Sequence, residues 1–344
     1  MLSNYKTKII MKLYEITSDA GIEQLQITTR DRPAIKSDQV LLKLHAASLN
    51  YRDLMVAGGG YPRNDSRPVI ALSDGAGEII EVGNDVSSWK VGDRVMPNFM
   101  RDWIDGPVDE KALKSGLGGG VDGVLAEYIA VDAQALVAIP EHLSYAEAAT
   151  LPCAALTAWN ALESAGTSKG DTVLILGTGG VALFGIAFAK ALGARTIVTS
   201  RSEAKLKAIS DLGVDDELVL PSDGDYSEPV LKLTNEKGVD HVLDIGGPGS
   251  IERSLKATRV GGTVSLIGVL DTDSTSILPA LLNAQRIQGI YVGSVEMFTR
   301  MARFIADHQL RPHIDRTFTF AAAKAAYHYL AEQKHTGKVV IEFT

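Results

Sequence analysis

Cysteine is nearly absent from this sequence, because Cys153 is the only one among 344 residues. A single thiol excludes an intramolecular disulfide, and such scarcity is typical of proteins kept in a reducing compartment. No apolar run approaches the roughly 20 residues that a membrane-spanning helix requires. The first residues include lysines but no long apolar core and no small-residue cleavage site, so we expect no secretory signal. These absences predict a cytoplasmic protein that does not enter a membrane.

The sequence has no excess of positive charge, because 42 Asp and Glu outnumber 34 Lys and Arg. The formal net charge is −8, so we expect no positively charged surface that binds nucleic acid or an anionic membrane.

The zinc-site motifs HExxH and CxxC do not occur. A content of 45% hydrophobic and 22% charged residues is typical of a well-packed globular protein, and 344 residues favour two domains over one. A small molecule is therefore the expected partner.

What the sequence does contain is a glycine-rich turn between an apolar strand and a helix. Residues 172–182 read TVLILGTGGVA. The first glycine permits a tight turn, the second lets the backbone approach a pyrophosphate, and Ala182 fills the small position where the helix packs on the strand. The amides that open the helix suit an anion, as does the helix dipole. The pattern predicts dinucleotide binding by Gly177, Gly179, Gly180 and Val181, and a turn that serves packing alone is the alternative.

The residue that usually selects NAD is missing. An NAD site carries Asp or Glu about 20 residues after the glycines, where it binds the ribose hydroxyl, but no acidic residue occurs between the glycines and Glu203. The second strand ends in Ser200 and Arg201 instead, with Lys205 one helical turn further on. A hydroxyl and two cations suit a 2′-phosphate, so we expect NADPH rather than NADH. Either cation alone is equally well explained as a solvated charge, and Ser202 is expected to cap the next helix.

The spacing of apolar residues divides the chain into two patterns. Residues 12–135 contain short strands punctuated by glycine, which predicts a β-barrel-like domain. From about residue 144 helices alternate with strands, which predicts an α/β protein with a doubly wound parallel sheet. The expected strands of this sheet are 172–176, 195–199, 217–220, 241–245, 263–267 and 286–292.

The tail after residue 294 breaks this alternation, so we expect it to pack on the first domain. The expected domains are therefore 1–153 with 294–344, and 154–293. Residues 98–122 have no clear period. They are interpreted either as a mobile loop near a pocket or as a plain surface excursion.

Several separate segments together resemble the medium-chain dehydrogenase/reductase superfamily. They are SLNYRDL (48–54), LSDGAGE (72–78), KVGDRV (90–95), ATLPC (149–153), the glycine turn and GKVV (337–340). The number and order of these motifs make the resemblance specific, and the chain is most similar to the alcohol-dehydrogenase-like, quinone-oxidoreductase-like branch. The resemblance implies a GroES-like, barrel-type catalytic domain and a Rossmann domain that binds the cofactor.

The chain departs from the zinc-dependent members at the metal site. Those members hold catalytic zinc with a Cys, the His of a Gly-His-Glu motif and a second Cys. The matching positions here are Asn50, Ser73 and Cys153, with Asp74 in place of the Glu. Zinc needs about three good nitrogen, sulfur or oxygen ligands, which one thiol with an amide and a hydroxyl does not provide. Residues 98–122 also lack the four cysteines of the family's structural zinc. We expect no zinc, and Cys153 is expected to be a small core residue rather than a nucleophile.

Without a metal, hydrogen-bond donors must stabilise the negative charge that develops on a carbonyl oxygen. The resemblance places Asn50 and Tyr51 on the segment that faces the nicotinamide in the family. Tyr51 is expected to donate its phenolic proton or to orient the substrate, and Asn50 to donate an amide N–H. Arg52 with Asp53, and Asp74, are alternatives for relaying a proton or for fixing those two side chains. Arg52 with Asp53 is also explained as a structural ion pair that ties the strand down.

Further cofactor contacts are predicted in both halves of the chain. The family contacts the nicotinamide at the position of Thr157, whose hydroxyl is also explained by a bond to its own helix backbone. Gly246, Gly268 and Val269 follow later strands on the side where a doubly wound sheet binds its ligand. Lys338 is assigned either to a cofactor phosphate or to a charge at a strand edge.

These observations predict an NADPH-dependent, zinc-independent oxidoreductase that transfers a hydride to a quinone or to an α,β-unsaturated carbonyl. An alcohol/aldehyde dehydrogenase is the second interpretation, although such an enzyme normally uses zinc to acidify the alcohol. A non-catalytic NADPH-binding protein is the third. The resemblance also implies a homodimer, because members of the family commonly pair through their Rossmann sheets.

Overall fold

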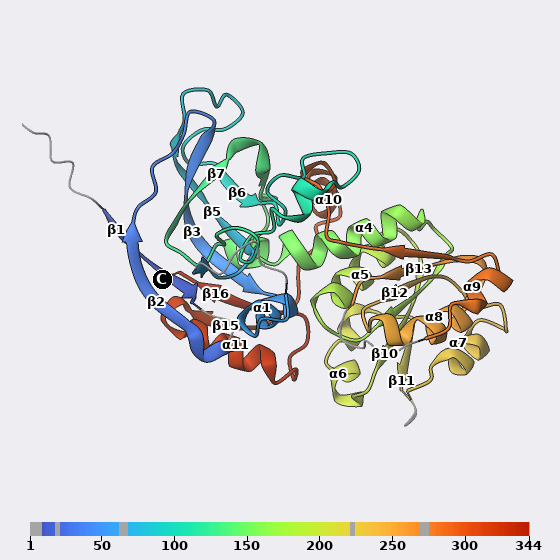
Figure 1. The fold of residues 1–344 in the computed structure, drawn as a ribbon. Coiled ribbons are helices and arrows are strands. Elements are labelled where there is room, and N and C mark those ends of the chain that lie inside the picture. The colour runs from blue at the N-terminus through green and yellow to red at the C-terminus, as the bar shows by residue number, and fades with distance from the viewer. Residues whose placement is uncertain (1–8, 18–20, 62–67, 221–223, 269–274, 344) are drawn as a thin grey trace, which may run out of the picture. The chain divides into compact units, whose positions relative to one another are not determined.

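The computed structural model describes residues 9–17, 21–61, 68–220, 224–268 and 275–343. The chain forms two compact units (Figure 1). Unit 1 comprises Met1–Cys153 and Gly293–Thr344, and unit 2 comprises Ala154–Val292. In the part of the chain that the structure describes, no helix has both the length and the apolar character needed to cross a membrane.

Unit 1 is built from short strands, most of them paired antiparallel. Its strands are β1 (Ile10–Ile16), β2 (Leu25–Asp31), β3 (Gln39–Leu49), β4 (Val69–Ile70), β5 (Asp74–Val82), β6 (Arg94–Pro97), β7 (Tyr128–Asp132), β8 (Leu136–Ala138), β15 (Ile314–Thr319) and β16 (Lys338–Glu342). Among the described residues, the larger sheet has the order β15-β16-β3-β5-β6-β8, with β7 also paired to β3, and the smaller sheet has the order β2-β1-β4. Side chains of a strand alternate between its faces. In β1, for example, Met11 and Leu13 are buried while Lys12 is exposed.

The helices of unit 1 connect and cover these strands. They are α1 (Tyr51–Ala57), α2 (Glu110–Leu113), α3 (Tyr145–Ala148), α10 (Val295–Asp307) and α11 (Ala323–Ala331). Strand β16 pairs antiparallel with β3, so that Val339 lies opposite Leu49. The expectation that the tail packs on the first domain is therefore confirmed. This pairing also brings the last strand next to the start of α1.

Unit 2 contains a parallel sheet covered by helices. Its strands are β9 (Thr172–Leu176), β10 (Arg195–Ser200), β11 (Asp216–Val219), β12 (Val239–Asp244), β13 (Thr258–Leu266) and β14 (Arg286–Gly289). They form a sheet of order β11-β10-β9-β12-β13-β14 in which every adjacent pair is parallel. The predicted α/β class with a doubly wound sheet is confirmed. The strand order reverses between β9 and β12, which is the position where such sheets bind ligands.

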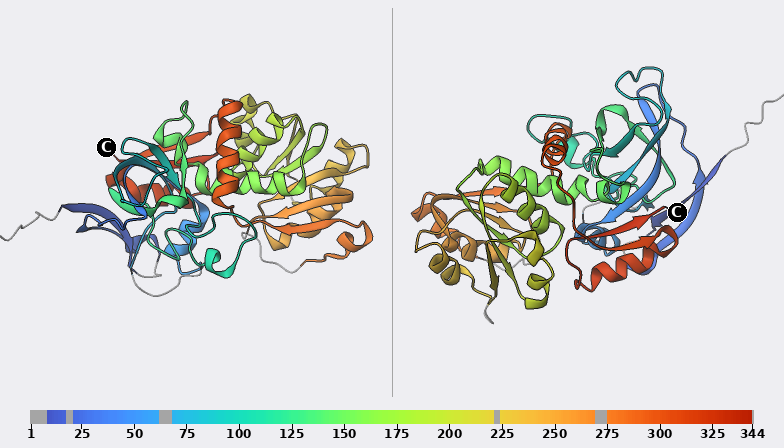
Figure 2. Two further views of the ribbon diagram at one scale, coloured as in Figure 1. Left: turned by 90° about the horizontal axis from the view of Figure 1, so that it is seen from above. Right: turned by 180° about the vertical axis from the view of Figure 1, so that it is seen from behind.

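Helices cover both faces of this sheet. They are α4 (Leu156–Ala165), α5 (Gly180–Ala191), α6 (Glu203–Lys207), α7 (Ser227–Leu233), α8 (Ile251–Ala257) and α9 (Leu278–Leu282). Helix α5 packs with α4, and α8 packs with α7 and α9. Figures 1 and 2 show these two groups on opposite faces of the sheet. A Cβ atom at Gly185 would lie 2.7 Å from the Leu243 side chain, so glycine there lets α5 approach the central strands closely.

Two expectations about secondary structure require correction. The strand predicted over 286–292 ends at Gly289, and Val292 has φ +51°, a left-handed conformation that cannot continue a strand. Residues 98–122 are not a plain surface excursion, because Phe99, Met100 and Leu117 are buried. The lack of a period reflects irregular but packed backbone around the short helix α2.

Candidate functional site

The glycine turn of unit 2 has the backbone geometry that close approach to a ligand requires. Gly177 directly follows β9 and has φ +85°, a conformation that favours glycine. Gly179 is the N-cap residue of α5 with φ −82°, which other residues also adopt. A Cβ atom at either position would meet no atom within 4 Å. Both glycines therefore border open space, which argues against a turn that serves packing alone.

The start of α5 has no side chain that caps it. Gly179 makes no side-chain cap hydrogen bond, whereas the Ser202 hydroxyl accepts from the backbone N of Lys205 and caps α6 as expected. The first amides of a helix lack carbonyl partners within the helix. The amides of Gly180 and Val181 therefore suit an anion, which the helix dipole also favours. This chemistry fits the pyrophosphate of a dinucleotide.

The residues predicted to select NADPH lie beside this turn. The backbone N of Gly177 donates to the carbonyl oxygen of Thr199 at 2.8 Å, which places the turn next to the end of β10. Ser200 is buried, and its Oγ accepts from the backbone N of Ser202 at 3.1 Å. Arg201 is exposed and Lys205 is partly buried. The Ser200 hydroxyl and the cations of Arg201 and Lys205 therefore lie within six consecutive residues, 200–205, at the carboxyl end of β10.

A polar network that sequence reasoning missed links the end of β12 to the turn that follows it and to α8. Asp244 ends β12 and is fully buried. Its Oδ1 accepts from the backbone N of Gly246 at 3.0 Å and from Ser250 Oγ at 2.5 Å, and its Oδ2 accepts from Ser254 Oγ at 2.7 Å. The carboxylate thus fixes the turn that follows β12. The predicted cofactor residue Gly246 lies in this turn.

Gly268 has a steric role of its own. A Cβ atom at this position would lie 1.8 Å from the carbonyl oxygen of Ile245, so only glycine allows the end of β13 to approach the end of β12. Thr157, the predicted nicotinamide contact, is buried in the first turn of α4. Val269 lies outside the described residues. The cofactor roles of these three residues stay predictions.

In unit 1 the predicted catalytic residues lie at the start of α1. Asn50 is the N-cap residue, and its backbone N donates to Asp53 Oδ2 at 2.8 Å, as in a capping box. Asp53 is therefore buried beneath the helix start rather than presented to a ligand. Burial raises the pKa of Asp53 to about 6, although the Arg52 guanidinium opposes this shift. In contrast to Asp53, Tyr51 is 41% exposed.

Arg52 ties the irregular segment 98–122 to α1. Its Nη1 donates to Asp53 Oδ1 at 3.1 Å and to the carbonyl oxygen of Leu117 at 2.8 Å. The guanidinium lies over the rings of Tyr61, at 4.6 Å, and Phe99, at 5.1 Å. The structural ion pair considered for Arg52 and Asp53 is therefore present. The pair lies within α1 and does not tie down a strand, and the separate bond from Arg52 to Leu117 joins this helix to the loop.

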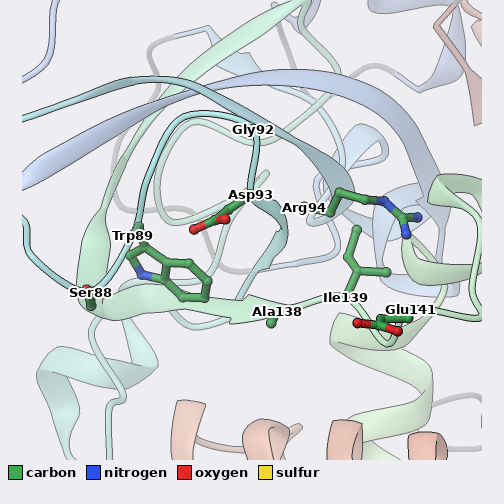
Figure 3. A pocket seen from close by; sticks show the side chains of 8 residues that line it. All are labelled: Ser88, Trp89, Gly92, Asp93, Arg94, Ala138, Ile139 and Glu141. Atoms are coloured by element: carbon green, nitrogen blue, oxygen red, sulfur yellow. The ribbon is translucent and has the colours of Figure 1, made fainter.

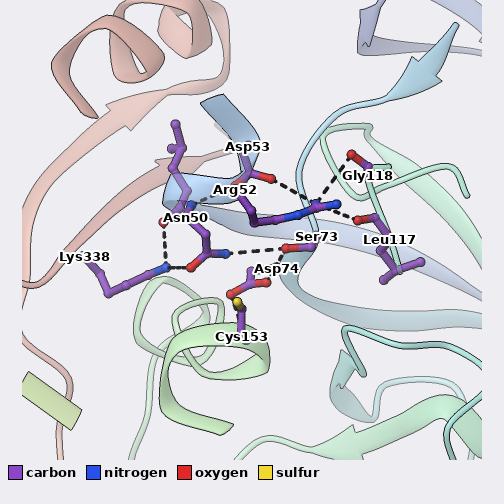
Figure 4. Close-up of polar contacts among 10 residues, drawn as sticks. Asn50, Arg52, Asp53, Ser73, Asp74, Leu117, Gly118, Cys153 and Lys338 are labelled. Atoms are coloured by element: carbon purple, nitrogen blue, oxygen red, sulfur yellow. Dashed lines mark hydrogen bonds and ion pairs between the residues drawn. The ribbon is translucent and has the colours of Figure 1, made fainter. Parts of the chain in front are cut away.

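Lys338 is buried, and its ammonium group lies beside the Asn50 side chain (Figure 4). Its Nζ donates to the carbonyl oxygen of Leu49 and to Asn50 Oδ1, each at 2.6 Å. Strand β16 lies between β15 and β3, so the interpretation of Lys338 as a strand-edge charge is wrong. Burial lowers the pKa of Lys338, and the Asp74 carboxylate opposes that shift.

Asp74 completes this cluster. Its Oδ1 accepts from Ser73 Oγ at 2.6 Å, and its Oδ2 accepts from the backbone N of Cys153 at 3.0 Å. Asn50 Nδ2 donates to Ser73 Oγ at 3.5 Å. Burial raises the pKa of Asp74, and the Lys338 ammonium is the main opposing influence. We call Asn50, Ser73, Asp74, Cys153 and Lys338 the Asn50 cluster.

The Asn50 cluster does not fit a catalytic zinc. The amide oxygen of Asn50 already accepts from an ammonium group, which would repel a second cation. Burial raises the pKa of the Cys153 thiol, and the Asp74 carboxylate raises it further, so the thiolate that binds zinc is disfavoured. The Ser73 hydroxyl is directed at Asp74. Across the described ranges, no group of three or more His, Cys, Asp or Glu side chains is arranged to hold a metal ion.

A hollow of about 320 Å³ lies elsewhere in unit 1 (Figure 3). It is lined by Ser88, Trp89, Gly92, Asp93, Arg94, Ala138, Ile139 and Glu141. None of the predicted site residues lines it. The indole N–H of Trp89 donates to the carbonyl oxygen of Ala133, so this polar group of the wall is engaged within the protein.

Two family models match the chain. "Alcohol dehydrogenase GroES-like domain" matches residues 36–141, and "Zinc-binding dehydrogenase" matches residues 180–307. The chain is 40% identical to a zinc-type alcohol dehydrogenase-like protein of Schizosaccharomyces pombe, over 94% of this chain and 96% of that protein. It is 32% identical to a 2-methylene-furan-3-one reductase of Solanum lycopersicum, over 96% of this chain and 79% of that one. It is 30% identical to an NADPH-dependent alkenal/one oxidoreductase of Arabidopsis thaliana, over 96% and 79% of the two chains.

Solved structures show the same architecture. A candidate alcohol dehydrogenase from Sinorhizobium meliloti 1021 superposes with a TM-score of 0.91 at 36% identity, over 98% of this chain and 99% of that one. The quinone oxidoreductase from Coxiella burnetii superposes with a TM-score of 0.79 at 26% identity, over 98% and 100% of the two chains. The fold, the glycine turn and these relatives agree, and the chain belongs to the medium-chain dehydrogenase/reductase superfamily of oxidoreductase enzymes.

Proposed function

We propose that this enzyme is an NADPH-dependent, zinc-independent reductase of quinones or of α,β-unsaturated carbonyl compounds. When bound, the reduced nicotinamide supplies a hydride to the electrophilic carbon of the acceptor, the electron pair moves to the carbonyl oxygen, and a solvent proton completes the product. The chain's own residues bind the phosphates and stabilise the oxygen. The Asn50 cluster carries the proposal, because it presents an amide and a buried ammonium where zinc relatives have metal ligands.

The choice of NADPH rests on unit 2. Arg201 and Lys205 follow β10 where an NAD site has a carboxylate, and an acidic residue there would repel a 2′-phosphate. The matched plant alkenal/one oxidoreductase is by name NADPH-dependent. Loss of a charge-assisted hydrogen bond costs about 1.5–3 kcal/mol, so Arg201→Ala should weaken NADPH binding about 10–100-fold. NADH binding should stay the same. The exposed Arg303→Ala on α10 is the control.

The choice of acceptor rests on unit 1. Hydrogen-bond donors that face a developing oxyanion perform the same task as a metal that polarises a carbonyl. Asn50 is partly exposed and Tyr51 is exposed, so an amide N–H and a phenolic O–H are accessible at the start of α1. Names of matched relatives include a furanone reductase, an alkenal/one oxidoreductase and a quinone oxidoreductase. Their chemistry favours activated double bonds and quinones over simple alcohols.

One panel experiment separates the candidate functions. The purified enzyme is assayed for NADPH oxidation with enones, enals, quinones and saturated aldehydes, and its metal content is measured. We expect turnover of an enone or quinone without bound zinc. Stoichiometric zinc with alcohol oxidation would instead establish an alcohol dehydrogenase, as the names of the family model and the Schizosaccharomyces pombe relative suggest. Tight NADPH binding with no turnover of any acceptor would indicate a non-catalytic binder.

We also propose that the enzyme is a homodimer formed through unit 2. Strand β14 ends the parallel sheet, so one of its edges has no partner strand within the described chain. Large apolar side chains are exposed near it on β13, at the N-cap of α9 and on α9, namely Val260, Ile277, Leu278, Leu281 and Leu282. Such an apolar patch indicates a protein contact. Leu281→Glu should convert a dimer to a monomer in mass measurements in solution, whereas the exposed Leu113→Glu of unit 1 should not.

A further inference from the structure

The Asn50 cluster is a chain of hydrogen bonds with fixed direction. It runs from Lys338 Nζ to Asn50 Oδ1, from Asn50 Nδ2 to Ser73 Oγ, and from Ser73 Oγ to Asp74 Oδ1. An ammonium group has no acceptor, and an ionised carboxylate has no donor. The two ends therefore fix the direction of every bond between them. Neither the amide nor the hydroxyl can reverse without losing a partner.

This direction decides how the Asn50 amide lies. Its oxygen must face Lys338, because only the oxygen can accept from the ammonium. Its Nδ2 must then face Ser73, and the amide nitrogen carries a second N–H. Lys338 is 3% exposed, and Ser73 and Asp74 are fully buried, but Asn50 is partly exposed. Of the four residues in this hydrogen-bond chain, Asn50 is thus the one that is partly exposed to solvent.

We propose that Lys338 is a positioning residue that holds the Asn50 amide so that one N–H faces Ser73 and Asp74 while the second N–H donates to the carbonyl oxygen of the acceptor. The inference rests on the proposed function. The buried ammonium polarises the amide through its oxygen, and Asp74 balances the charge at the other end. A protein cation thereby supplies the positive charge near the oxyanion that a metal supplies in zinc relatives. In this proposal the oriented Asn50 amide performs the role that the metal ion has in zinc relatives.

Three substitutions test this inference against a purely structural role. Removing one oxyanion donor lowers kcat about 10²–10³-fold, so we expect that loss for Asn50→Leu. Lys338→Met removes the group that orients the amide, and we expect it to lower kcat by about 10-fold or more while KM changes less. Residues that act through one another are non-additive. The double variant should therefore be no slower than Asn50→Leu alone, and the exposed Lys334→Met should match the wild type.

A readout that does not depend on activity is available. With selective ¹⁵N labelling of asparagine, the side-chain NH₂ signals of Asn50 are assigned by their loss in Asn50→Leu. Lys338→Met should shift these signals, and Lys334→Met should leave them in place. If the wild type reduces no acceptor, the proposed function fails, while the NH₂ signals still decide whether Lys338 orients Asn50.

Four results would overturn the inference. The first is an additive loss of kcat in the double variant, and the second is an unchanged Asn50 NH₂ signal in folded Lys338→Met. The third is NADPH binding weakened about 10-fold or more by Lys338→Met, because a loss of about 1.4 kcal/mol would place the ammonium on a cofactor phosphate. If Lys338→Met does not fold, Asn50→Asp decides, because its carboxylate still accepts from Lys338 but cannot donate. Retention of kcat in Asn50→Asp would be the fourth.

Discussion

His241 should make the stability of unit 2 depend strongly on pH. Its ring is 2% exposed on β12, where Nδ1 lies 3.1 Å from Thr167 Oγ1 and Nε2 lies 2.8 Å from Ser265 Oγ. Burial lowers the pKa of His241 from 6.5 to about 3, and the positive charge of Arg286 adds to this. The folded protein therefore holds a neutral imidazole under conditions in which the unfolded chain takes up a proton.

The direction of the effect follows from this difference in pKa. The folded-state pKa lies below the unfolded value, so the stability contribution is complete above pH 6.5 and is lost as the pH falls toward 3. Each pH unit within this window costs about 1.4 kcal/mol. The wild type should therefore lose about 2 kcal/mol from this residue between pH 6.5 and about pH 4.5.

His241→Gln tests this reasoning, because glutamine carries no charge at any of these pH values. The free energy of unfolding is measured by urea titration with far-UV circular dichroism at several pH values. Any constant cost of the substitution cancels when the slopes of stability against pH are compared. The wild type should have the steeper slope, and His308→Gln, which alters an exposed ring directly after α10, should keep the wild-type slope. Equal slopes for wild type and His241→Gln would refute the assignment of a neutral, proton-resistant imidazole.

Three further predictions concern other positions. The folded-state pKa of Asp53, about 6, lies above its ordinary 3.8, so its contribution to stability is complete below pH 3.8 and is lost as the pH rises through 6. Relative to Asp53→Asn, the wild type should lose about 2 kcal/mol between pH 4 and pH 7 in urea titrations, and parallel curves would contradict this. Gly179→Ala adds a methyl group in open space and should leave thermal stability nearly unchanged while weakening NADPH binding about 10–100-fold through lost phosphate contacts. Gly268→Ala places its methyl group against the carbonyl oxygen of Ile245 and should lower the free energy of unfolding by about 3 kcal/mol or more. Gly60→Ala, whose methyl group meets Met55 at 3.9 Å, should not lower it. A stable Gly268→Ala would contradict the close approach of β13 to β12.

The sequence by itself determined the features that depend on local pattern. The strand–turn–helix at 172–182 and the alternation after residue 144 require only short-range periodicity and turn chemistry, and both are present as β9, α5 and the parallel sheet. The missing carboxylate after β10 and the loss of the usual zinc ligands are also visible in the sequence, because each is a matter of which residue stands at one position.

Only the tertiary structure decided which distant side chains meet. Lys338 lies 288 residues from Asn50 along the chain, yet the pairing of β16 with β3 brings its ammonium to the amide oxygen. Arg52 likewise bonds to Leu117, which lies in the segment 98–122. The sequence of that segment has no periodicity from which its packing could be predicted. Buried polar groups must find hydrogen-bond partners, but burial is a property of the packed chain. The sequence therefore named Asn50 as a candidate, and the fold determined which way its amide faces.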